Sequence, residues 1–435
     1  MHDPLTLVAV ALGAVLLVGG GLWFWRKTRR SARHARLLAR QEQLGLDEPV
    51  SLHPRIDEHT CICTGACVEV CPEKDVLGMV SGKPHLVNPS ACIGHGECMR
   101  ACPVGAIQLV IGTEKRGVDL PLVDAGFQTN VPGLYIAGEL GGMGLIHNAV
   151  HQGRQAVEAI AKSNPPKQAG VLQVLIVGAG PAGLSAALAA KAAGLDFALL
   201  EAESFGGALR SYPRQKIVMT APMALPLYGK VKLSRTTKES LIELWEDVIR
   251  KTGIAVEQGK RVASVERQAD GSFKVATSAG ERRTQRVLLA VGRRGSPRKL
   301  GVPGEELAKV TYRLLEPEQY ARTRCVVVGG GDSAAETALM LADHAEVTLC
   351  HRGDKFDRVK PETRERLEKS RVTIKLQATL EAIAEQEVTI SGGDKLANDY
   401  VFVCIGGELP TEWLGKMGIE VKTMRGEVHP AMARA

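Results

Sequence analysis

The cysteines of this 435-residue chain are strongly clustered, because seven of the ten lie between positions 61 and 102. They form two successive runs, and each run ends in a Cys-Pro step. The runs contain Cys61, Cys63, Cys67 and Cys71, followed by Cys92, Cys98 and Cys102. Such a doubled run is typical of the thiolate ligands of two iron–sulfur clusters. A structural zinc site would instead require two pairs of ligands. The spacing therefore indicates single-electron chemistry.

Both runs depart from the Cys-x2-Cys-x2-Cys-x3-Cys-Pro spacing of two-cluster ferredoxins at the second ligand position. Thr64 stands there in the first run, with Cys63 one residue earlier, and His95 stands there in the second run. In ferredoxins of this kind, the fourth cysteine of each run binds the other cluster. We therefore expect two ligand sets, namely Cys61, Cys67 and Cys102 for one cluster and Cys71, Cys92 and Cys98 for the other.

The fourth ligand of each cluster is left open by the sequence. Cys63 is a candidate for the first cluster. His95 is a candidate for the second, because imidazole is a competent iron ligand in Rieske centres. The alternative for His95 is a loop residue that faces solvent. A site with three cysteines would then hold a three-iron cluster in place of a four-iron cluster.

A glycine-rich motif predicts a first dinucleotide-binding site. It follows an apolar strand at 171–177, opens an alanine-rich helix, and contains Gly178, Gly180, Pro181, Ala182 and Gly183. These glycines allow a tight turn and let backbone N–H groups approach a pyrophosphate at the helix N-terminus. Glu201 ends the next predicted strand, where an acid binds a ribose hydroxyl. That acid does not by itself distinguish FAD from NAD.

A second motif of the same kind follows an apolar strand at 325–328. It contains Gly329, Gly331, Asp332, Ser333 and Ala334. The next predicted strand ends in His351 and Arg352 rather than in an acid. Because an arginine at this place accommodates a 2′-phosphate, NADP(H) is favoured and NAD(H) stays open. Arg358 is a second candidate for the same contact.

The N-terminal region has the pattern of a membrane anchor. Residues 5–25 are uncharged and almost wholly apolar, which is enough for a helix to cross a hydrocarbon core of about 30 Å. Trp23 and Trp25 stand at its end, and the positions 26–40 contain seven Lys or Arg and no acid. The net charge of the whole chain is also +7, so the remainder is near neutral and does not indicate nucleic-acid binding. The positive-inside rule predicts a single-pass anchor in the cytoplasmic membrane, with the catalytic domains on the cytoplasmic side. A cleaved signal peptide is disfavoured because the basic residues follow the apolar run.

From about residue 171 to 425 the chain resembles the thioredoxin-reductase-like branch of flavoproteins with two dinucleotide sites, in particular their ferredoxin–NADP reductase-like members. The resemblance rests on both glycine motifs, on Glu201, on Gly206 and Gly207 after Phe205, and on the segments 290–297 and 301–304. It implies that the first motif binds FAD and the second NADPH. It also implies that the second domain is inserted into the first, and that a domain rotation brings the nicotinamide to the flavin.

Two departures from this family are visible in the sequence. The redox-active Cys-x-x-Cys that precedes the second motif in thioredoxin reductases is absent, and Cys325, Cys350 and Cys404 lie in apolar strand patterns that predict packing roles. The segment that closes the FAD domain near the C-terminus of the family is also absent. A similar segment at 129–139, including Gly138 and Glu139, lies upstream of the first motif and precedes a predicted helix at 144–162. This order is that of a circular permutation.

The predicted fold class is α/β, with two nested Rossmann-like domains for FAD and NAD(P), a small α+β domain like that of bacterial ferredoxins, and one transmembrane helix. The predicted boundaries are 1–40 for the anchor, 41–111 for the linker and cluster domain, 112–165 for the moved FAD segment, 171–304 for the FAD domain, 305–405 for the NAD(P) domain, and 406–435 for the return to the FAD domain.

The predicted function is electron transfer between NAD(P)H, FAD and the clusters, with a ferredoxin, a flavodoxin, a quinone or a membrane redox subunit as the acceptor. Flavin chemistry needs no side chain as an acid or base, so no catalytic residue is assigned. A homodimer is left open. The alternatives are a non-catalytic redox sensor or assembly subunit, and a disulfide reductase, which the missing Cys-x-x-Cys disfavours.

Overall fold

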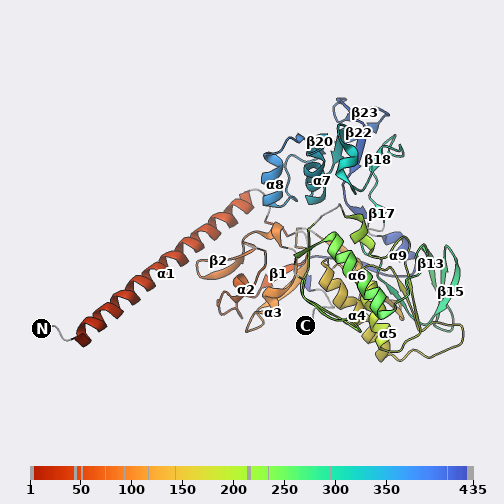
Figure 1. Cartoon of the computed structure of the whole chain (residues 1–435), viewed down its shortest axis with the longest axis horizontal. Coiled ribbons are helices and arrows are strands. Elements are labelled where there is room, and N and C mark those ends of the chain that lie inside the picture. The colour runs from red at the N-terminus through yellow and green to blue at the C-terminus, as the bar shows by residue number, and fades with distance from the viewer. Residues whose placement is uncertain are drawn as a thin grey trace. The chain divides into compact units, whose positions relative to one another are not determined.

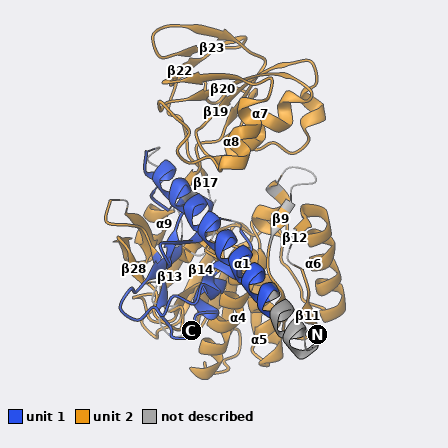
Figure 2. Cartoon of the chain, turned by 90° about the vertical axis from the view of Figure 1, so that its left-hand side faces the viewer, with its two compact units in different colours: residues 1–92, 96–110 blue, residues 93–95, 111–435 orange. Residues whose placement is uncertain are grey.

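The computed structural model describes residues 4–43, 47–49, 52–73, 75–92, 94–115, 117–142, 144–212, 217–233, 235–293, 296–408 and 410–428. Positions 294 and 295 of the expected FAD segment, and the end of the chain from 429 onward, lie outside this range. The chain divides into two compact units (Figure 2). Unit 1 comprises residues 1–92 and 96–110, and unit 2 comprises residues 93–95 and 111–435.

Unit 1 begins with α1 (Pro4–Gln43), a single helix of 40 residues (Figure 1). Apolar residues fill its first half and basic residues its second half, and its only proline is at the first helical position, where a missing N–H costs nothing. Among the residues that the structure describes, no helix combines the length and the apolar character that are needed to span a bilayer. The side chains at 4–12, which belong to the predicted anchor, lie outside the described part.

The cluster domain in unit 1 repeats one short motif. α2 (Ala66–Glu69) and α3 (Glu97–Arg100) each begin after a glycine in the left-handed region, Gly65 at φ 76° and Gly96 at φ 83°. β1 (His53–Ile56) pairs antiparallel with β4 (Ile107–Ile111). β2 (Leu77–Val80) and β3 (Lys83–Leu86) form a hairpin between the two cysteine runs, and a 3-10 turn at Pro89–Ala91 follows.

Unit 2 contains two parallel sheets, and the first surrounds the first glycine motif. Its strand order is β6 (Leu134–Ile136), β16 (Val287–Leu289), β7 (Val174–Val177) and β8 (Phe197–Leu200). The neighbouring strands all pair in parallel. The strand expected from residue 171 starts at Val174, because the side chain of Gln173 is buried and bonds to the carbonyl oxygen of Pro165 at 2.6 Å.

Helices and small antiparallel sheets complete this domain. The helices are α4 (Ile146–Lys162), α5 (Pro181–Ala192) and α6 (Lys238–Thr252). The antiparallel strands are β13 (Val262–Arg267), β14 (Phe273–Thr277) and β15 (Gly280–Thr284), with the pairs β9 (Ile217–Met219) and β12 (Arg235–Thr237), and β10 (Met223–Leu225) and β11 (Gly229–Val231).

The second parallel sheet surrounds the second glycine motif. Its order is β18 (Val310–Thr311), β25 (Tyr400–Val403), β19 (Arg324–Val328), β20 (Glu346–His351) and β21 (Thr373–Leu376). α7 (Asp332–Ala342) and α8 (Pro361–Glu368) accompany it, together with the antiparallel strands β22 (Leu380–Ile383), β23 (Glu387–Ile390) and β24 (Lys395–Ala397). β17 (Ser296–Pro297) pairs with β26 (Gly407–Glu408), so the chain enters and leaves this domain side by side.

The chain then returns to the first domain. After α9 (Thr411–Lys416), β27 (Val421–Met424) pairs antiparallel with β5 (Val118–Pro121), and β28 (Glu427–Val428) is the last described strand. The Asn130 side chain adds two hydrogen bonds, to the Gly418 carbonyl oxygen at 2.8 Å and from the Glu420 N–H at 2.9 Å. The segment that connects the cluster domain to the flavin domain is therefore held by the end of the chain.

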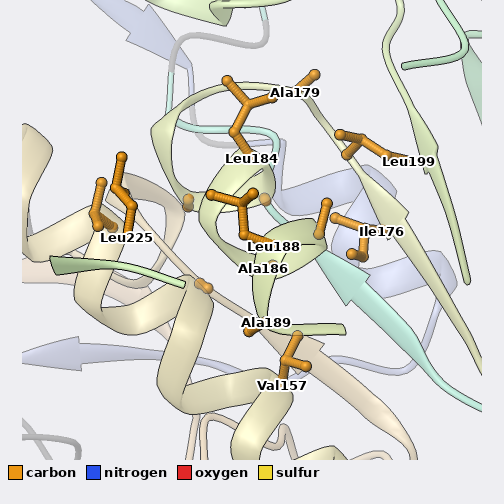
Figure 3. Packing of buried hydrophobic residues seen from close by; sticks show 14 of the residues in the cluster. Val157, Ile176, Ala179, Leu184, Ala186, Leu188, Ala189, Leu199 and Leu225 are labelled. Carbon is orange, nitrogen blue, oxygen red and sulfur yellow. The ribbon is translucent and has the colours of Figure 1, made fainter. Parts of the chain in front are cut away.

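The core of the first domain lies between its sheet and its helices. Figure 3 shows Val157 of α4 beside Ala189 of α5, and Leu184 and Leu188 of α5 belong to the same buried cluster as Ile176 of β7. All of these side chains are buried. Burying one large aliphatic side chain contributes about 1.5–3 kcal/mol, so the α4–α5–sheet contact is a main source of this domain's stability.

Candidate cofactor sites

Unit 2 contains a cavity of about 1440 Å³ that is lined by both glycine motifs. Single small-molecule pockets usually enclose about 300–1,000 Å³, so this volume suits more than one ligand. Most of the predicted dinucleotide-binding residues line it: Gly178, Gly180, Pro181, Ala182, Glu201, Gly207, Glu139, Gly329, Gly331, Asp332, Ser333 and Arg352. The other four predicted residues, Gly138, Gly183, Gly206 and Ala334, are not among the residues that line it.

At each of the three positions of the first motif, a different feature of the local geometry explains why the residue is glycine. Gly178 has φ +101°, and a Cβ there would lie 2.6 Å from the carbonyl oxygen of Ala290. A Cβ on Gly183 would lie 1.7 Å from the carbonyl oxygen of Gly178. A Cβ on Gly180 would meet nothing within 4 Å, and Gly180 lines the cavity. Two glycines therefore permit close packing, and the third leaves space for a ligand.

The start of α5 is suited to bind an anion. The helix begins at Pro181, and its N-cap residue Gly180 provides no side-chain cap. The first N–H groups of an α-helix have no partner within the helix, and the helix dipole is positive at this end. Because this end lines the cavity, its uncapped N–H groups fit the pyrophosphate of a dinucleotide.

Glu201 follows β8 and is 8% exposed. Its carboxylate accepts hydrogen bonds from the Ala179 N–H at 2.7 Å and from the Glu203 N–H at 3.0 Å. An ionised carboxylate can accept about four hydrogen bonds, so two remain for a ligand hydroxyl. These backbone bonds fix the carboxylate beside the first motif, as ribose binding requires.

The segment upstream of the first motif contributes to the same cavity. Gly138 follows β6 with φ +85°, and its N–H donates to the Gln152 side chain at 2.7 Å. Glu139 comes next and lines the cavity. A Cβ on Gly153 of α4 would lie 2.0 Å from the carbonyl oxygen of Ala182. Gln152 and Gly153 were missed from the sequence, although a glycine inside a helical pattern is a signal of close packing.

The second motif has the same division of roles. Gly329 has φ +152°, and a Cβ there would lie 2.4 Å from the carbonyl oxygen of Cys404. A Cβ on Gly331 would meet nothing within 4 Å, and α7 begins directly after it without a side-chain cap. Asp332 accepts a hydrogen bond from the Lys360 N–H at 2.7 Å. Ala334 is fully buried in the contact between helix and sheet.

Basic and acidic side chains mix at the end of β20. Arg352, Lys355, Arg358 and Lys360 line this part of the cavity, together with Asp354 and Asp357. The sequence identified Arg352 but missed the packing of its neighbour, His351. That ring stacks on Phe356 with centroids 5.1 Å apart, and it lies so close to Gly330 that a Cβ there would be 2.0 Å from the ring.

The structure brings the first set of cysteines together in unit 1. A small cavity there is lined by Cys61, Cys63, Cys67 and Cys102. The Ala106 N–H donates to the Cys102 sulfur at 3.2 Å. Cys63 is exposed and adopts a left-handed backbone with φ 56°. The thiols at this cavity are those expected for one cluster, including the proposed fourth ligand.

The second set is more deeply placed. Burial, together with the neighbouring Cys92 and Cys71, raises the pKa of Cys98 to about 12. Iron binds the thiolate, so occupation of this site releases protons. Among the described residues, no group of three or more His, Cys, Asp or Glu is arranged to hold a metal ion. His95 belongs to the segment 93–95, which is grouped with unit 2, and its role as a ligand stays a prediction.

None of the three cysteines outside these runs is in a disulfide. Cys325 and Cys350 are buried, and burial raises the pKa of Cys350 to about 11. The Cys404 thiol is partly buried and lies 3.7 Å from the Thr337 hydroxyl. Protonated thiols in such surroundings are poor nucleophiles.

Comparisons with known proteins match two parts of the chain to known families. A family model described as pyridine nucleotide-disulphide oxidoreductase matches residues 175–432, and one described as a 4Fe-4S dicluster domain matches residues 53–103. The N-terminal helix and the segment at 104–174 lie outside both matches. The α/β fold with two dinucleotide sites and the iron–sulfur domain are thus confirmed, whereas the anchor and the permutation stay predictions.

Individual relatives agree with these matches. A ferredoxin–NADP reductase of Ignicoccus hospitalis is 30% identical over 259 residues, which are 57% of this chain and 81% of that protein. The bacilliredoxin reductase Bdr of Bacillus subtilis is 27% identical over 267 residues, which are 58% and 82% of the two chains. Among solved structures, the bacillithiol disulfide reductase Bdr of Staphylococcus aureus is 26% identical, with a TM-score of 0.52 over 57% of this chain and 80% of that chain.

Proposed function

Because the chain belongs to the pyridine nucleotide-disulphide oxidoreductase family and carries a 4Fe-4S dicluster domain, we propose that it transfers electrons from NAD(P)H through FAD to its clusters and onward to a separate acceptor. The observation that carries this proposal is the single cavity lined by both glycine motifs, in a chain that also contains the cluster domain. Bound FAD accepts a hydride and releases its electrons singly, which connects NAD(P)H to one-electron carriers.

The chain's own residues bind and orient the two dinucleotides in this proposal. The uncapped start of α5 receives the FAD pyrophosphate, Glu201 binds a ribose, and Glu139 lines the same cavity. The uncapped start of α7 receives the second pyrophosphate, and Arg352 with Arg358 favours the 2′-phosphate of NADP. The position of β6 in the first sheet supports a circularly permuted FAD domain.

The cluster domain holds two clusters in this proposal. Cys61, Cys67 and Cys102 bind the first cluster with Cys63 as the fourth ligand, in keeping with the cavity that these four line. Cys71, Cys92 and Cys98 bind the second, with His95 as the fourth ligand or with a three-iron cluster in its place. The acceptor that the ferredoxin–NADP reductase relatives favour is a ferredoxin-type carrier, and a flavodoxin, a quinone and a membrane redox subunit are the alternatives.

Membrane attachment through the N-terminal helix is also part of the proposal. Its support is the apolar stretch at 5–25 and the exposure of its described side chains, which reaches 79% at Leu17 and 63% at Phe24. Exposed apolar surface of this extent marks an interaction site. Deleting residues 1–40 is expected to release a coloured protein from membranes. A truncated protein that still sediments with membranes in high salt would contradict the attachment.

A second candidate function is disulfide reduction, which the similarity to the Bdr proteins favours. Against it, the chain has no cysteine between 310 and 320, and its three cysteines outside the cluster runs form no disulfide and are at least partly buried. The test is NADPH oxidation by the purified full-length protein, with ferricyanide and with a low-molecular-weight disulfide in parallel. We expect steady turnover with ferricyanide only. Turnover with the disulfide would favour the reductase, and bound cofactors without turnover would favour a sensor.

A further inference from the structure

The cluster domain contains two Cys-Pro steps, and α1 is docked against the segment that contains the first of them. Arg30 lies 2.8 Å from the Glu69 carboxylate of α2. One turn later, Arg33 forms an ion pair with Asp75, in the loop before β2. Cys71, which opens the first Cys-Pro step, lies in the chain between these two acids. The helix therefore contacts the domain on both sides of this step.

A buried histidine makes this contact a close one. His34 is 1% exposed, and its Nδ1 lies 3.3 Å from the Met79 carbonyl oxygen of β2. A Cβ on Gly78 would lie 2.6 Å from the ring, so only glycine permits this approach. The Ser81 N–H also donates to the Ser31 hydroxyl at 3.2 Å. A partner protein can therefore reach this side of the domain only by displacing the helix.

The second Cys-Pro step, Cys102-Pro103, lies at an open part of the surface. Ile62 and Val104 line the cavity that contains the first set of cysteines. Ile62 is 61% exposed and Val104 is 38% exposed, and Cys63 and Pro103 are exposed as well. We call Ile62, Cys63, Pro103 and Val104 the apolar rim of this cavity.

The two Cys-Pro steps differ in the residue that follows them. Glu73 follows the step that α1 contacts, and Val104 follows the step at the open surface. A single exposed aliphatic side chain needs no explanation, whereas a contiguous exposed apolar patch marks an interaction site. Because Ile62 and Val104 border the same cavity, they belong to the second kind.

The charges next to the rim balance each other. The Lys83 ammonium lies 2.8 Å from the Glu58 carboxylate. Both groups act on the pKa of the Cys63 thiol, which Lys83 lowers and Glu58 raises. The basic residues at 26–40 belong to α1 instead. A partner that recognises the rim must therefore present uncharged, apolar side chains to it.

We propose that the apolar rim is the docking surface for a soluble ferredoxin-type carrier, which meets it with aliphatic side chains. This inference rests on the proposed function, which requires a separate one-electron acceptor. The cavity that the rim borders is lined by the thiols expected for one cluster. The rim is also small. A stable interface takes about 20–30 residues on each side, whereas weak redox encounters are among the smallest interfaces known, so a transient carrier fits better than a permanent subunit.

The test measures binding rather than turnover. The full-length protein, purified with its cofactors in a mild detergent, is titrated with a soluble two-cluster ferredoxin in a calorimeter. The titration is done at about 0.05 M and about 0.5 M salt, because added salt screens exposed charge pairs and leaves apolar contacts intact. Ile62→Glu and Val104→Glu place a charge on the rim, and Ile62→Leu keeps it apolar. Leu227→Glu, at a leucine of unit 2 that is 57% exposed, is the matched control.

The wild type, Ile62→Leu and Leu227→Glu are expected to bind the ferredoxin with the same affinity at both salt concentrations. Ile62→Glu and Val104→Glu should bind it at least about tenfold more weakly, because an apolar contact would then bury a charge without a partner. Circular dichroism checks the folding of each variant. Ile62→Ser and Val104→Ser, which remove the apolar groups without adding a charge, replace any glutamate variant that does not fold.

Four results would overturn the inference. They are the absence of binding to the wild type, unchanged binding in both rim variants, an equal loss in Leu227→Glu, and a wild-type dimer that Ile62→Glu dissociates, which would assign the rim to a second copy of the chain. Binding that is lost at high salt and in Arg36→Glu, an exposed position of α1, would also overturn it in favour of the basic helix. Ferredoxin binding without NADPH–ferricyanide turnover in the wild type would instead contradict the proposed function.

Discussion

Gly153 of α4 lies directly against the carbonyl oxygen of Ala182 at the start of α5, since a Cβ at Gly153 would come within 2.0 Å of that oxygen. Gly153 lies upstream of the first glycine motif in the chain, and Ala182 is part of that motif. Ala182 lines the cavity, and Gln152, the neighbour of Gly153, binds the Gly138 N–H. This contact therefore connects the upstream segment to the start of α5.

The variant Gly153→Ala is expected to lower the free energy of unfolding by about 1–3 kcal/mol, because overpacking a tight contact forces the helices apart. It should also lose FAD during purification, since the start of α5 moves. Thermal melting and the ratio of bound flavin to protein measure both effects. Gly415→Ala in α9, where a Cβ meets nothing within 4 Å, is the matched control. Wild-type melting and full flavin content in Gly153→Ala would disprove the importance of the contact.

Two glycines of the first motif should respond differently to the same change. Gly183→Ala is expected to prevent folding of the domain, because its Cβ would lie 1.7 Å from the Gly178 carbonyl oxygen. Gly180→Ala is expected to fold and to bind FAD weakly, because its methyl group would extend into the cavity. Soluble yield and circular dichroism report folding, and flavin titration reports binding. Equal FAD affinity in Gly180→Ala and the wild type would show that no ligand occupies this space.

The two cysteine sets predict which substitutions share a phenotype. Cys61→Ser and Cys102→Ser should perturb one cluster signal, and Cys71→Ser should perturb the other, despite the order of these residues in the chain. Electron paramagnetic resonance spectra of the reduced protein distinguish the two signals, and Cys325→Ser serves as the control. If Cys61→Ser and Cys71→Ser changed the same signal, the crossed assignment would be wrong.

The same spectra test which residue is the fourth ligand of each cluster. Cys63→Ser is expected to change the signal that depends on Cys61, and His95→Ala the signal that depends on Cys71. Iron analysis accompanies both measurements, because a three-iron site lowers the total. Spectra identical to the wild type in both variants, with about eight irons per chain as two four-iron clusters require, would remove any special role for Cys63 and His95.

Electron flow should not require the cysteines outside the cluster domain. The triple variant Cys325→Ser, Cys350→Ser, Cys404→Ser is expected to show flavin reduction by NADPH followed by cluster reduction, as in the wild type. The physical reason is that a protonated thiol is inert in dithiol exchange, and burial raises the pKa of both Cys325 and Cys350. Stopped-flow absorbance follows both steps. A variant in which flavin reduction persists and cluster reduction stops would reveal a thiol relay.

The surroundings of Asp247 lead us to expect that the folding stability of the protein depends on pH. Hydrogen bonds from Lys251 and Tyr228, with Arg250 beside them, lower the pKa of Asp247 from 3.8 to about 2. A carboxyl group with a depressed pKa in the folded state contributes stability that is present above its unfolded pKa and is lost as the pH falls from about 4 to about 2. The difference in melting temperature between the wild type and Asp247→Asn should therefore shrink in this window. Glu243→Gln, at an exposed position of the same helix, is the control, and a difference that grows toward low pH would contradict the assignment.

The sequence predicted the features that short segments determine. The glycine motifs and Glu201 follow from local spacing, because turn geometry and strand patterns leave few alternatives. The contacts that it missed join residues far apart in the chain: Gly153 with Ala182, His351 with Gly330, and His34 with Gly78. The residues next to such a glycine in the sequence do not show why glycine is needed there. The three-dimensional structure shows it, because it reveals which distant residue lies against the glycine.

The pairing of β6 with β16 determines when the first sheet can form during synthesis. β6 leaves the ribosome about 150 residues before its partner β16. The interval between the synthesis of β5 and that of its partner β27 is longer still. At about 5–20 residues per second, β6 remains unpaired for roughly 10–30 s. During this time an apolar strand is exposed to other nascent chains. We therefore expect the yield of this protein to depend on general chaperones that bind extended apolar segments.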